Sequence, residues 1–166
     1  MAALSFRITV RAPREKVFDF ISNGENAPQW HGSIRSARHT APLPIRRGSH
    51  LVLGAKLGRR QFSRVQEVSW WDPPTSFEDR MIPDRSEIRK EEPGPPPFRT
   101  FGDSCELRDV PGGTEVLFGV KYGLPYGPLG TLLDLLVFRT RVRTETEQSL
   151  QRLKTLLESP ASTTTD

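Results

Sequence analysis

Apolar and polar residues alternate at the start of the chain, over residues 4–11, which read LSFRITVR. The apolar members of this segment are Leu4, Phe6, Ile8 and Val10. Successive side chains of a strand point to opposite faces, so this alternation is typical of a strand with one buried face. We therefore expect a strand here whose even-numbered residues face inward.

A helical spacing follows, after an Ala-Pro break. Pro13 suits the first turn of a helix, and the residue before it is pushed toward extended geometry. Val17, Phe20 and Ile21 recur at helical spacing, and the run Ser-Asn-Gly ends the segment. A further short turn fits residues 25–30, so we expect two short helices after the first strand.

Six more strand patterns fill most of the middle of the chain, separated by turn signals such as LGRR, DPPT and VPGG. They cover residues 33–41, 48–57, 61–71, 75–82, 98–109 and 113–124. Short turns connect antiparallel neighbours, so these segments predict a strongly curved antiparallel sheet of about seven strands in all. The exception is the segment 83–97, whose five prolines and many charges predict a long loop.

The last expected element is a long helix over residues 128–158, where leucine and valine recur at a roughly helical spacing. The run SPASTTTD after it has little to bury and is expected to be disordered. A chain of 166 residues fits one domain of ordinary size. We therefore expect a single α+β domain over residues 1–158 and a disordered tail over 159–166.

Residues that lie opposite each other in a hairpin share a face, so the inward set can be carried from strand to strand. This places two carboxylates, Asp79 and Asp103, on the concave face of the sheet. The other side chains expected to face inward include Ile34, Arg38, Arg64, Gln66, Trp70, Phe77, Phe101, Cys105, Phe118, Val120 and Tyr122. Apolar walls with a few ionisable groups are typical of a ligand cavity. A single bulge would invert the faces of a strand.

Composition indicates the compartment in which the protein is expected. One cysteine, Cys105, excludes an intramolecular disulfide and a cysteine-rich zinc site, and its apolar row makes it a core residue. The N-terminus lacks the basic-then-apolar pattern of a secretory signal, and no run approaches the ~18 apolar residues of a membrane span. We therefore expect a soluble protein of the reducing cytoplasm.

Charge is unevenly distributed along the chain. No acidic residue lies between Glu25 and Glu67, whereas twelve lie from Glu67 to Glu115. This asymmetry could steer an anionic ligand, or the basic residues could simply occupy the outward positions of strands. The basic segment has no interleaved aromatic residues, so we expect no nucleic-acid partner.

Four residues are candidates for chemistry. Asp79 and Asp103 would lie on adjacent strands as a carboxylate pair suited to proton transfer, unless Arg64 or Arg38 neutralises them. Among the three histidines, His31 is the best placed general base, near the expected mouth of the cavity. Tyr122 could donate a hydrogen bond to a ligand carbonyl.

Metal and cofactor chemistry find little support. His39 and His50 fall roughly opposite each other in one hairpin, but no third ligand accompanies them, and we expect no metal site. The chain has no phosphate-binding loop or dinucleotide fingerprint, so we also expect no cofactor. Cys105 lacks the histidine and acid that would make it a nucleophile.

Three arginines lie on the last helix: Arg139, Arg141 and Arg143. Together with the apolar run LLDLLVF they would suit an anionic membrane or a partner helix. The simpler interpretation, which we prefer from the sequence, is a solvated helix face. The pattern leaves the oligomeric state open.

Several motifs, taken in order, resemble one superfamily. They are the strand, Ala-Pro break and helix of ITVRAPREKVFDFIS, then PQWHGSI, RRGSHL, VQEVSWWDPP, PGGTEVLFGV and the ending LQRLKTLLE. Over residues 3–158 the chain resembles the SRPBCC superfamily, the START-like group that includes polyketide cyclases/dehydrases and lipid-transport proteins. The resemblance implies a helix-grip fold, in which a seven-stranded sheet wraps around the long C-terminal helix. Its loop at 83–97 is longer than that pattern would lead us to expect.

This resemblance also implies a small hydrophobic ligand, held between the sheet and the last helix. The residues expected to line its cavity are Trp30, Arg38, Arg64, Trp70, Phe77, Phe101, Phe118, Val120 and Leu135. Two functions stay open, because a fold does not fix a function. The protein could catalyse cyclisation or dehydration of a polyketide-like ligand, with Asp79, Asp103, His31 or Tyr122 assisting proton transfer. Alternatively, it could carry or sequester a lipid-like ligand without turnover.

Overall fold

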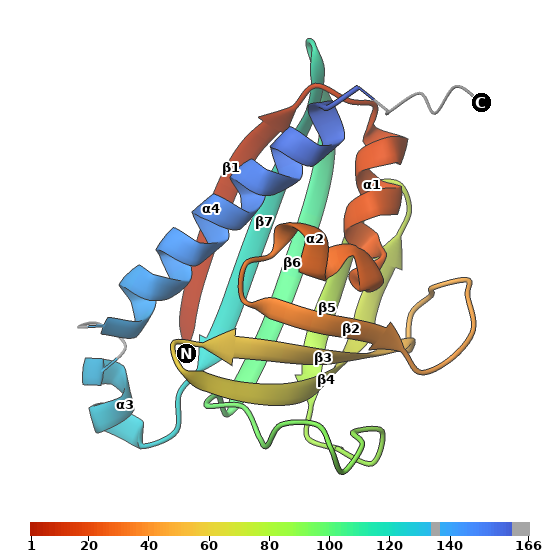
Figure 1. Cartoon of the computed structure of the whole chain (residues 1–166). Coiled ribbons are helices and arrows are strands. Elements are labelled where there is room, and N and C mark those ends of the chain that lie inside the picture. Colours follow the sequence, from red (N-terminus) through yellow and green to blue (C-terminus); the bar gives the residue numbers. More distant parts are fainter. Residues whose placement is uncertain (134–136, 161–166) are drawn as a thin grey trace.

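Seven antiparallel strands form one curved sheet (Figure 1) in a computed structural model that describes residues 1–133, apart from the Leu133 side chain, and residues 137–160. The strands are β1 (Ala2–Val10), β2 (Ile34–His39), β3 (His50–Leu57), β4 (Arg60–Asp72), β5 (Ser76–Ile82), β6 (Thr100–Val110) and β7 (Gly113–Gly123). Their order across the sheet is β1-β7-β6-β5-β4-β3-β2. The expected seven-stranded antiparallel sheet is confirmed.

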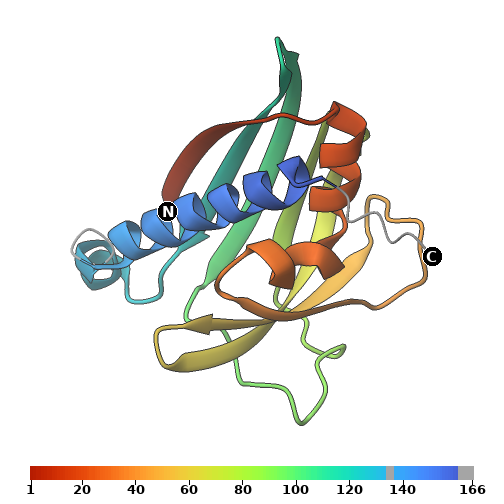
Figure 2. The ribbon, with the colours of Figure 1, turned by 45° about the horizontal axis from the view of Figure 1, so that its top comes forward.

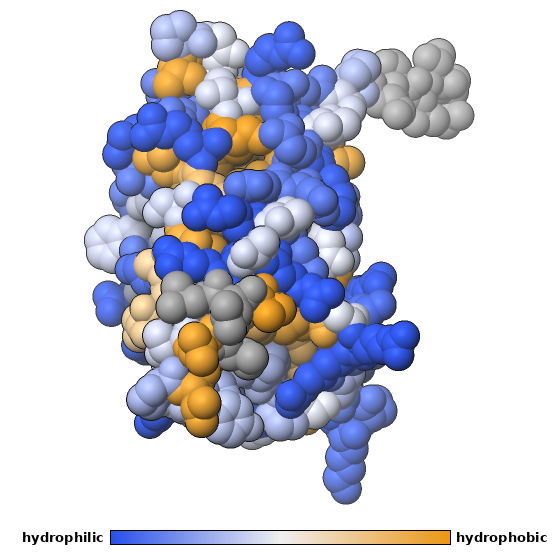
Figure 3. Space-filling view, turned by 90° about the vertical axis from the view of Figure 1, so that its left-hand side faces the viewer, coloured by the Kyte–Doolittle hydropathy of each residue, from blue (hydrophilic) through white to orange (hydrophobic). Residues whose placement is uncertain are grey.

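The helices are α1 (Arg14–Ser22), the 3-10 turn η1 (Gly24–Asn26), α2 (Ala27–Trp30), α3 (Gly127–Leu133) and α4 (Arg139–Glu158). They lie on the concave side of this sheet, except α3, which lies beyond the end of α4 (Figure 1). Helix α4 crosses the sheet diagonally (Figure 2), which is the helix-grip arrangement. In place of the single helix expected over 128–158 there are two helices, α3 and α4, which are not in line with each other (Figure 1); residues 134–136 between them lie outside the described residues. Figure 3 shows the side of the molecule on which α3 lies.

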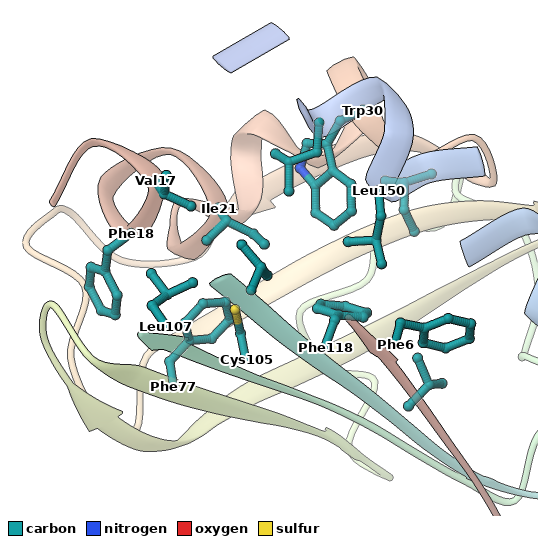
Figure 4. Packing of buried hydrophobic residues seen from close by; sticks show 14 of the residues in the cluster. Phe6, Val17, Phe18, Ile21, Trp30, Phe77, Cys105, Leu107, Phe118 and Leu150 are labelled. Carbon is teal, nitrogen blue, oxygen red and sulfur yellow. The ribbon is translucent and has the colours of Figure 1, made fainter. Parts of the chain in front are cut away.

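The core forms between the concave face and the helices (Figure 4). One row crosses four strands, because Phe6 lies opposite Phe118, Phe118 opposite Cys105, and Cys105 opposite Phe77. All four side chains are buried. The inward faces expected for β1, β6 and β7 are therefore confirmed, with Cys105 in the core.

Helix α4 is held in place by two hydrogen bonds to the chain beside the sheet. The Ser149 hydroxyl of α4 accepts from the Gly32 backbone N–H at 3.1 Å, just after α2. At the end of α4, Glu158 Oε1 accepts from the backbone N–H of Arg11 at 2.8 Å. The apolar stripe Leu150, Leu153 and Leu157 is buried against the sheet between these ties. The last turns of α4 are thus held in a fixed position.

A bulge in β2 corrects one sequence prediction. The register shifts between Ile34 and Ser36, so Arg38 lies opposite Val52 and faces the outer side of the sheet. Its guanidinium donates to Glu92 Oε1 at 3.0 Å, in the loop after β5. An extra residue in one strand reverses every face beyond it. Arg38, expected in the cavity, therefore does not line it.

A second bulge, in β4, corrects another prediction. The register shifts between Val68 and Trp70, and the following Trp71 lies opposite Phe77. Trp70 consequently faces outward, 49% exposed, with its indole N–H donating to Ser76 Oγ at 3.1 Å. Trp71 takes the inward place, where its ring lies 5.2 Å from that of Phe18 in α1.

The long loop expected at 83–97 is confirmed, since no strand or helix is assigned between β5 and β6. It packs on the outer side of the sheet through Arg85, which donates to the carbonyl of Ser63 at 2.6 Å, and through Glu87, whose Oε1 lies 2.9 Å from His50 Nδ1.

Within residues 1–133 and 137–160, no helix is long and apolar enough to cross a membrane.

Packing of α4 on the sheet predicts a large difference between two neighbouring leucines. Leu153 is 0% exposed and Leu156 is 43% exposed. We expect Leu153→Ala to lower the free energy of unfolding by about 2–5 kcal/mol, because it leaves a cavity in the core. Leu156→Ala, the matched control, should change it by less than about 1 kcal/mol. Urea unfolding followed by circular dichroism measures both, and equal losses would contradict this packing.

Candidate functional site

Two small cavities lie between the concave face and the helices. The first, about 40 Å³, is lined among others by Phe62, Phe101, Val120 and Val142. The second, about 50 Å³, is lined among others by Trp30, Leu51, Leu53, Phe77, Asp79 and Phe118. His31, Arg64 and Asp103 line both. The ionisable residues thus lie where the two cavities meet, and each cavity has room for one or two waters.

Arg64 is the central residue of this site. The alternation of β4 turns it inward, between Phe62 and Gln66, and its residue is only 6% exposed. Its guanidinium carbon lies 4.0 Å from the centre of the Phe101 ring, and Nη2 donates to Gln66 Oε1 at 3.5 Å. Its Nε is buried and meets no acceptor among the described residues. Burial lowers the pKa of Arg64, while Asp103 and Asp79 oppose that shift.

Asp79 and Asp103 lie directly opposite each other on β5 and β6, so the expected carboxylate pair on the concave face is present. Asp103 Oδ2 accepts from the amide Nε2 of Gln66 at 3.1 Å. A Cβ on Gly102 would lie 2.9 Å from the backbone carbonyl oxygen of Asp79. Glycine at this position therefore allows the close approach of the two strands that carry the pair.

The two carboxyls have raised pKa values. Burial and the neighbouring Asp103 raise the pKa of Asp79 to about 7, against the opposing effect of Arg64. Burial also raises the pKa of Asp103, while Arg64 and the hydrogen bond from Gln66 lower it. A carboxyl with a pKa near 7 can both take and give a proton at neutral pH. Asp79 therefore has the properties of a general acid or base.

His31 ends α2 and closes the site from the helical side. Burial, Arg64 and Arg152 lower the pKa of His31 to about 4, so the imidazole is neutral at neutral pH. Its Nδ1 lies 3.0 Å from the Ser33 hydroxyl oxygen. The ring of Trp30 lies beside it, with centroids 5.4 Å apart, and the buried Trp30 Nε1 has no partner among the described residues.

The other expected site residues divide into three groups. Phe77 and Phe118 line one cavity with Trp30, and Phe101 and Val120 line the other. Tyr122 is buried away from both, with its ring 5.4 Å from that of Phe138. Arg38 and Trp70 face the outer side, and Leu135 lies outside the described residues.

Metal binding finds no geometric basis in the part of the chain that the structure describes, where no group of three histidine, cysteine or acidic residues could hold an ion. His39 lies opposite Leu51, which lines a cavity, whereas His50 lies opposite Glu67 and contacts the loop on the outer side. The two histidines therefore face opposite sides of the sheet. The Cys105 thiol has its pKa raised by burial and stays protonated.

Sequence reasoning missed two charged residues that line a cavity, Lys56 of β3 and Glu145 of α4. Burial raises the pKa of Glu145, while Arg141 and Arg152 oppose the shift. Glu145 lies about one turn from Val142 and from Ser149, on the stripe of α4 that faces the sheet. The helical spacing contained that signal, but the neighbouring arginines made this part of the helix look solvated.

Comparison with known proteins supports the fold and a family. A family model described as polyketide cyclase/dehydrase and lipid transport matches residues 1–158. No curated protein matches the chain.

Solved structures similar to the chain include a START superfamily protein from Mycobacterium smegmatis, with 16% identity, a TM-score of 0.69 and coverage of 94% of this chain and 97% of that one. The ZhuI aromatase/cyclase from a Streptomyces species has 9% identity, a TM-score of 0.69 and coverage of 95% and 93%. The protein TTHA0849 from Thermus thermophilus has 17% identity, a TM-score of 0.72 and coverage of 94% and 97%. Identities this low show a shared fold.

The raised pKa of Asp79 predicts a pH-dependent stability. Its pKa moves from 3.8 to about 7, so the folded state holds this proton more tightly than the unfolded state does. The stabilisation is complete below about pH 4 and is lost as the pH rises toward about 7. In Asp79→Asn this loss is absent, so we expect the stability of the variant relative to wild type to grow by about 2–4 kcal/mol between about pH 4 and pH 8.

Urea unfolding at several pH values measures this difference. Glu78→Gln is the matched control, because Glu78 is the exposed neighbour on the outer face of the same strand. Parallel pH profiles for wild type and Asp79→Asn would contradict the assignment.

Proposed function

We propose a function from one premise: the chain belongs to the polyketide cyclase/dehydrase and lipid transport family, in the SRPBCC superfamily of helix-grip proteins. The protein binds a small, largely apolar ligand that carries carbonyl groups, and it assists the cyclisation or dehydration of that ligand by acid–base catalysis. Two similar structures support this class of reaction, ZhuI and the di-domain ARO/CYC protein BexL. The chain covers 50% of BexL, at 14% identity and a TM-score of 0.69.

One observation carries the proposal: a single cavity is lined by two residues with unpaired donors and by a carboxyl with a pKa near 7. The donors are Arg64 Nε and Trp30 Nε1, both buried without an acceptor among the described residues. The carboxyl is that of Asp79. A buried N–H without an acceptor costs free energy, and a ligand oxygen would recover it. The two donors suit a carbonyl oxygen of the ligand, and the carboxyl suits an acidic proton on the carbon beside that carbonyl.

The chemistry follows from these roles. Asp79 as a carboxylate removes a proton from the carbon next to a ligand carbonyl, and the electron pair moves to the carbonyl oxygen. Arg64 and Trp30 stabilise that enolate oxygen with hydrogen bonds. The enolate carbon then attacks a second carbonyl of the same ligand, and the new alkoxide takes the proton back from Asp79.

Dehydration uses the second carboxyl. Asp79 removes another proton from the same carbon, and the hydroxyl formed in the first step leaves as water with a proton from Asp103. Asp79 and Asp103 are therefore both needed, as one base and one acid, each with a raised pKa. His31 lines the same cavity, and because it is neutral it adds no charge beside the two carboxyls.

The ligand requires more room than the two cavities offer. Ligand pockets commonly have volumes of about 300–1,000 Å³. The cavities of about 40 and 50 Å³ share the wall formed by Arg64, which stacks on Phe101. In the complex, the Arg64 side chain leaves Phe101 to bond the ligand and the two cavities merge, and because their combined volume still falls short of that range, other side chains of their walls also move apart.

A second function, carrying a ligand without turnover, is favoured by a different observation. Arg64, Gln66 and Asp103 are already linked by hydrogen bonds, so part of the polar set is satisfied without any ligand. Structural networks of this kind also shift pKa values. In a carrier, the apolar walls would supply the affinity and the charged groups would only orient the ligand.

Turnover of a synthetic poly-β-ketone thioester separates the two functions. We expect Asp79→Asn to lower kcat by about 100-fold or more, because it removes the general base, with a much smaller change in KM. Since Asp79 acts as a carboxylate, kcat/KM of wild type should rise with pH through the value near 7. Asp103→Asn should slow dehydration and leave the rate of ring closure unchanged. The control variant Glu78→Gln should have the same activity as wild type.

Native mass spectrometry of the purified protein identifies any ligand that it retains. A protein that binds the thioester, with equal affinity in wild type and Asp79→Asn, but releases it unchanged is a carrier. That result would refute the catalytic proposal.

A further inference from the structure

Helix α3 (Gly127–Leu133) is apolar and yet exposed. Its sequence, GPLGTLL, has no charged residue. Among residues 127–132, only Gly130 is buried. Leu129 is 74% and Leu132 is 54% exposed. Their spacing of three residues places both on the same side of the helix. An exposed apolar surface of this kind marks a contact site.

Two further apolar residues extend this surface on both sides of α3. Tyr126 precedes the helix and is 79% exposed, and Val137, just before α4, is 58% exposed. We call Tyr126, Leu129, Leu132 and Val137 the apolar tip. In Figure 3, hydrophobic side chains gather at this end of the molecule, with strongly hydrophilic residues around them. The ribbon places α3 outside the layer formed by the sheet and α4 (Figure 1).

Basic residues surround the tip. Arg139, Arg141 and Arg143 are all exposed on the first turns of α4. The hairpin between β3 and β4 lies beside them, because a Cβ on Gly58 would be 3.2 Å from Arg141 Nη1, and that hairpin adds Arg59 and Arg60. Between Glu115 and Glu145 the sequence contains a single acid, Asp134, which lies outside the described residues.

We propose that this end of the protein docks on the surface of an anionic lipid bilayer. The apolar tip enters the boundary between headgroups and acyl chains, and the arginines bind lipid phosphates. Protruding leucines and tyrosine with a basic rim match that boundary, since it is apolar on one side and negatively charged on the other. Guanidinium groups also bind phosphate oxygens in pairs.

A groove beside the tip fits the same partner. It has a volume of about 340 Å³ and is lined by Ala2, Leu124 and Thr131, with Arg139 among its walls. A lipid could place part of its chain against the apolar walls while its phosphate meets Arg139. The docking proposal does not depend on what the internal cavity binds or catalyses.

Binding to large unilamellar vesicles tests the proposal, with flotation of the full chain on phosphatidylcholine alone and on mixed phosphatidylcholine and phosphatidylglycerol. We expect binding only to the anionic vesicles and a decrease at high salt, because salt screens the arginines. Leu129→Ser/Leu132→Ser and Arg139→Gln/Arg143→Gln should each weaken binding by about 10-fold or more.

The chain offers matched controls for both variants. Leu43 is another exposed leucine, 61% exposed, and Arg46 and Arg47 are two exposed arginines in the same distant loop. Leu43→Ser and Arg46→Gln/Arg47→Gln should bind as wild type does. All substituted side chains are exposed, so circular dichroism should show the fold unchanged in each variant.

Three results would overturn the proposal. One is wild type that stays unbound with anionic vesicles. Another is an equal loss for the tip variants and their controls, which would show that the binding does not depend on this surface. The last is a wild type that does not bind vesicles but forms a concentration-dependent dimer, measured by sedimentation, which Leu129→Ser/Leu132→Ser abolishes. That outcome would assign the tip to a second copy of the chain.

Discussion

The buried guanidinium of Arg64 is the interaction on which the interior depends. A charge in an apolar wall is unfavourable unless partners compensate it. Here the partners come from three strands: the Phe101 ring beneath it, the Gln66 amide beside it and the carboxyls of Asp79 and Asp103 nearby. Burial does most to keep His31 neutral, the same charge adds to that effect, and it also limits the rise in the pKa of Asp79. After burial, Arg64 is thus the one influence that acts on the pKa of all three of these groups, His31, Asp79 and Asp103.

Strand register decides where that charge lies, and much of the register could be predicted from the sequence. Strands β6 and β7 alternate so regularly that the inward positions of Asp103 and Phe118 followed from two independent patterns, and the hairpins then placed Asp79 and Arg64 correctly. The errors began at bulges. Arg35 in β2 and Ser69 in β4 are extra residues in their strands, and the two residues after the β4 bulge, Trp70 and Trp71, are both aromatic. Hydrophobicity could not tell which tryptophan faces inward.

The electrostatics of the site were beyond sequence reasoning for a different reason. The pKa of His31 is lowered first by burial and then by Arg64 of β4 and Arg152 of α4, which are remote in the sequence. Likewise, the unpaired donor of Trp30 could not be inferred from its neighbours, because only the packed interior shows whether an acceptor is near. A sequence pattern gives the face on which a group lies. Its protonation depends on residues that the fold brings there.

Helix α4 joins the two regions to which we assign functions. Its last turns are buried and tied to the sheet, whereas its first turns carry exposed arginines. Val142 and Glu145, which line a cavity, lie in those same first turns and alternate with Arg141 and Arg143. The arginines that bind lipid phosphates in our proposal therefore share the first turns of α4 with residues of the cavity wall. Because the far end of the helix is fixed, a displacement of the first turns would change the cavity first.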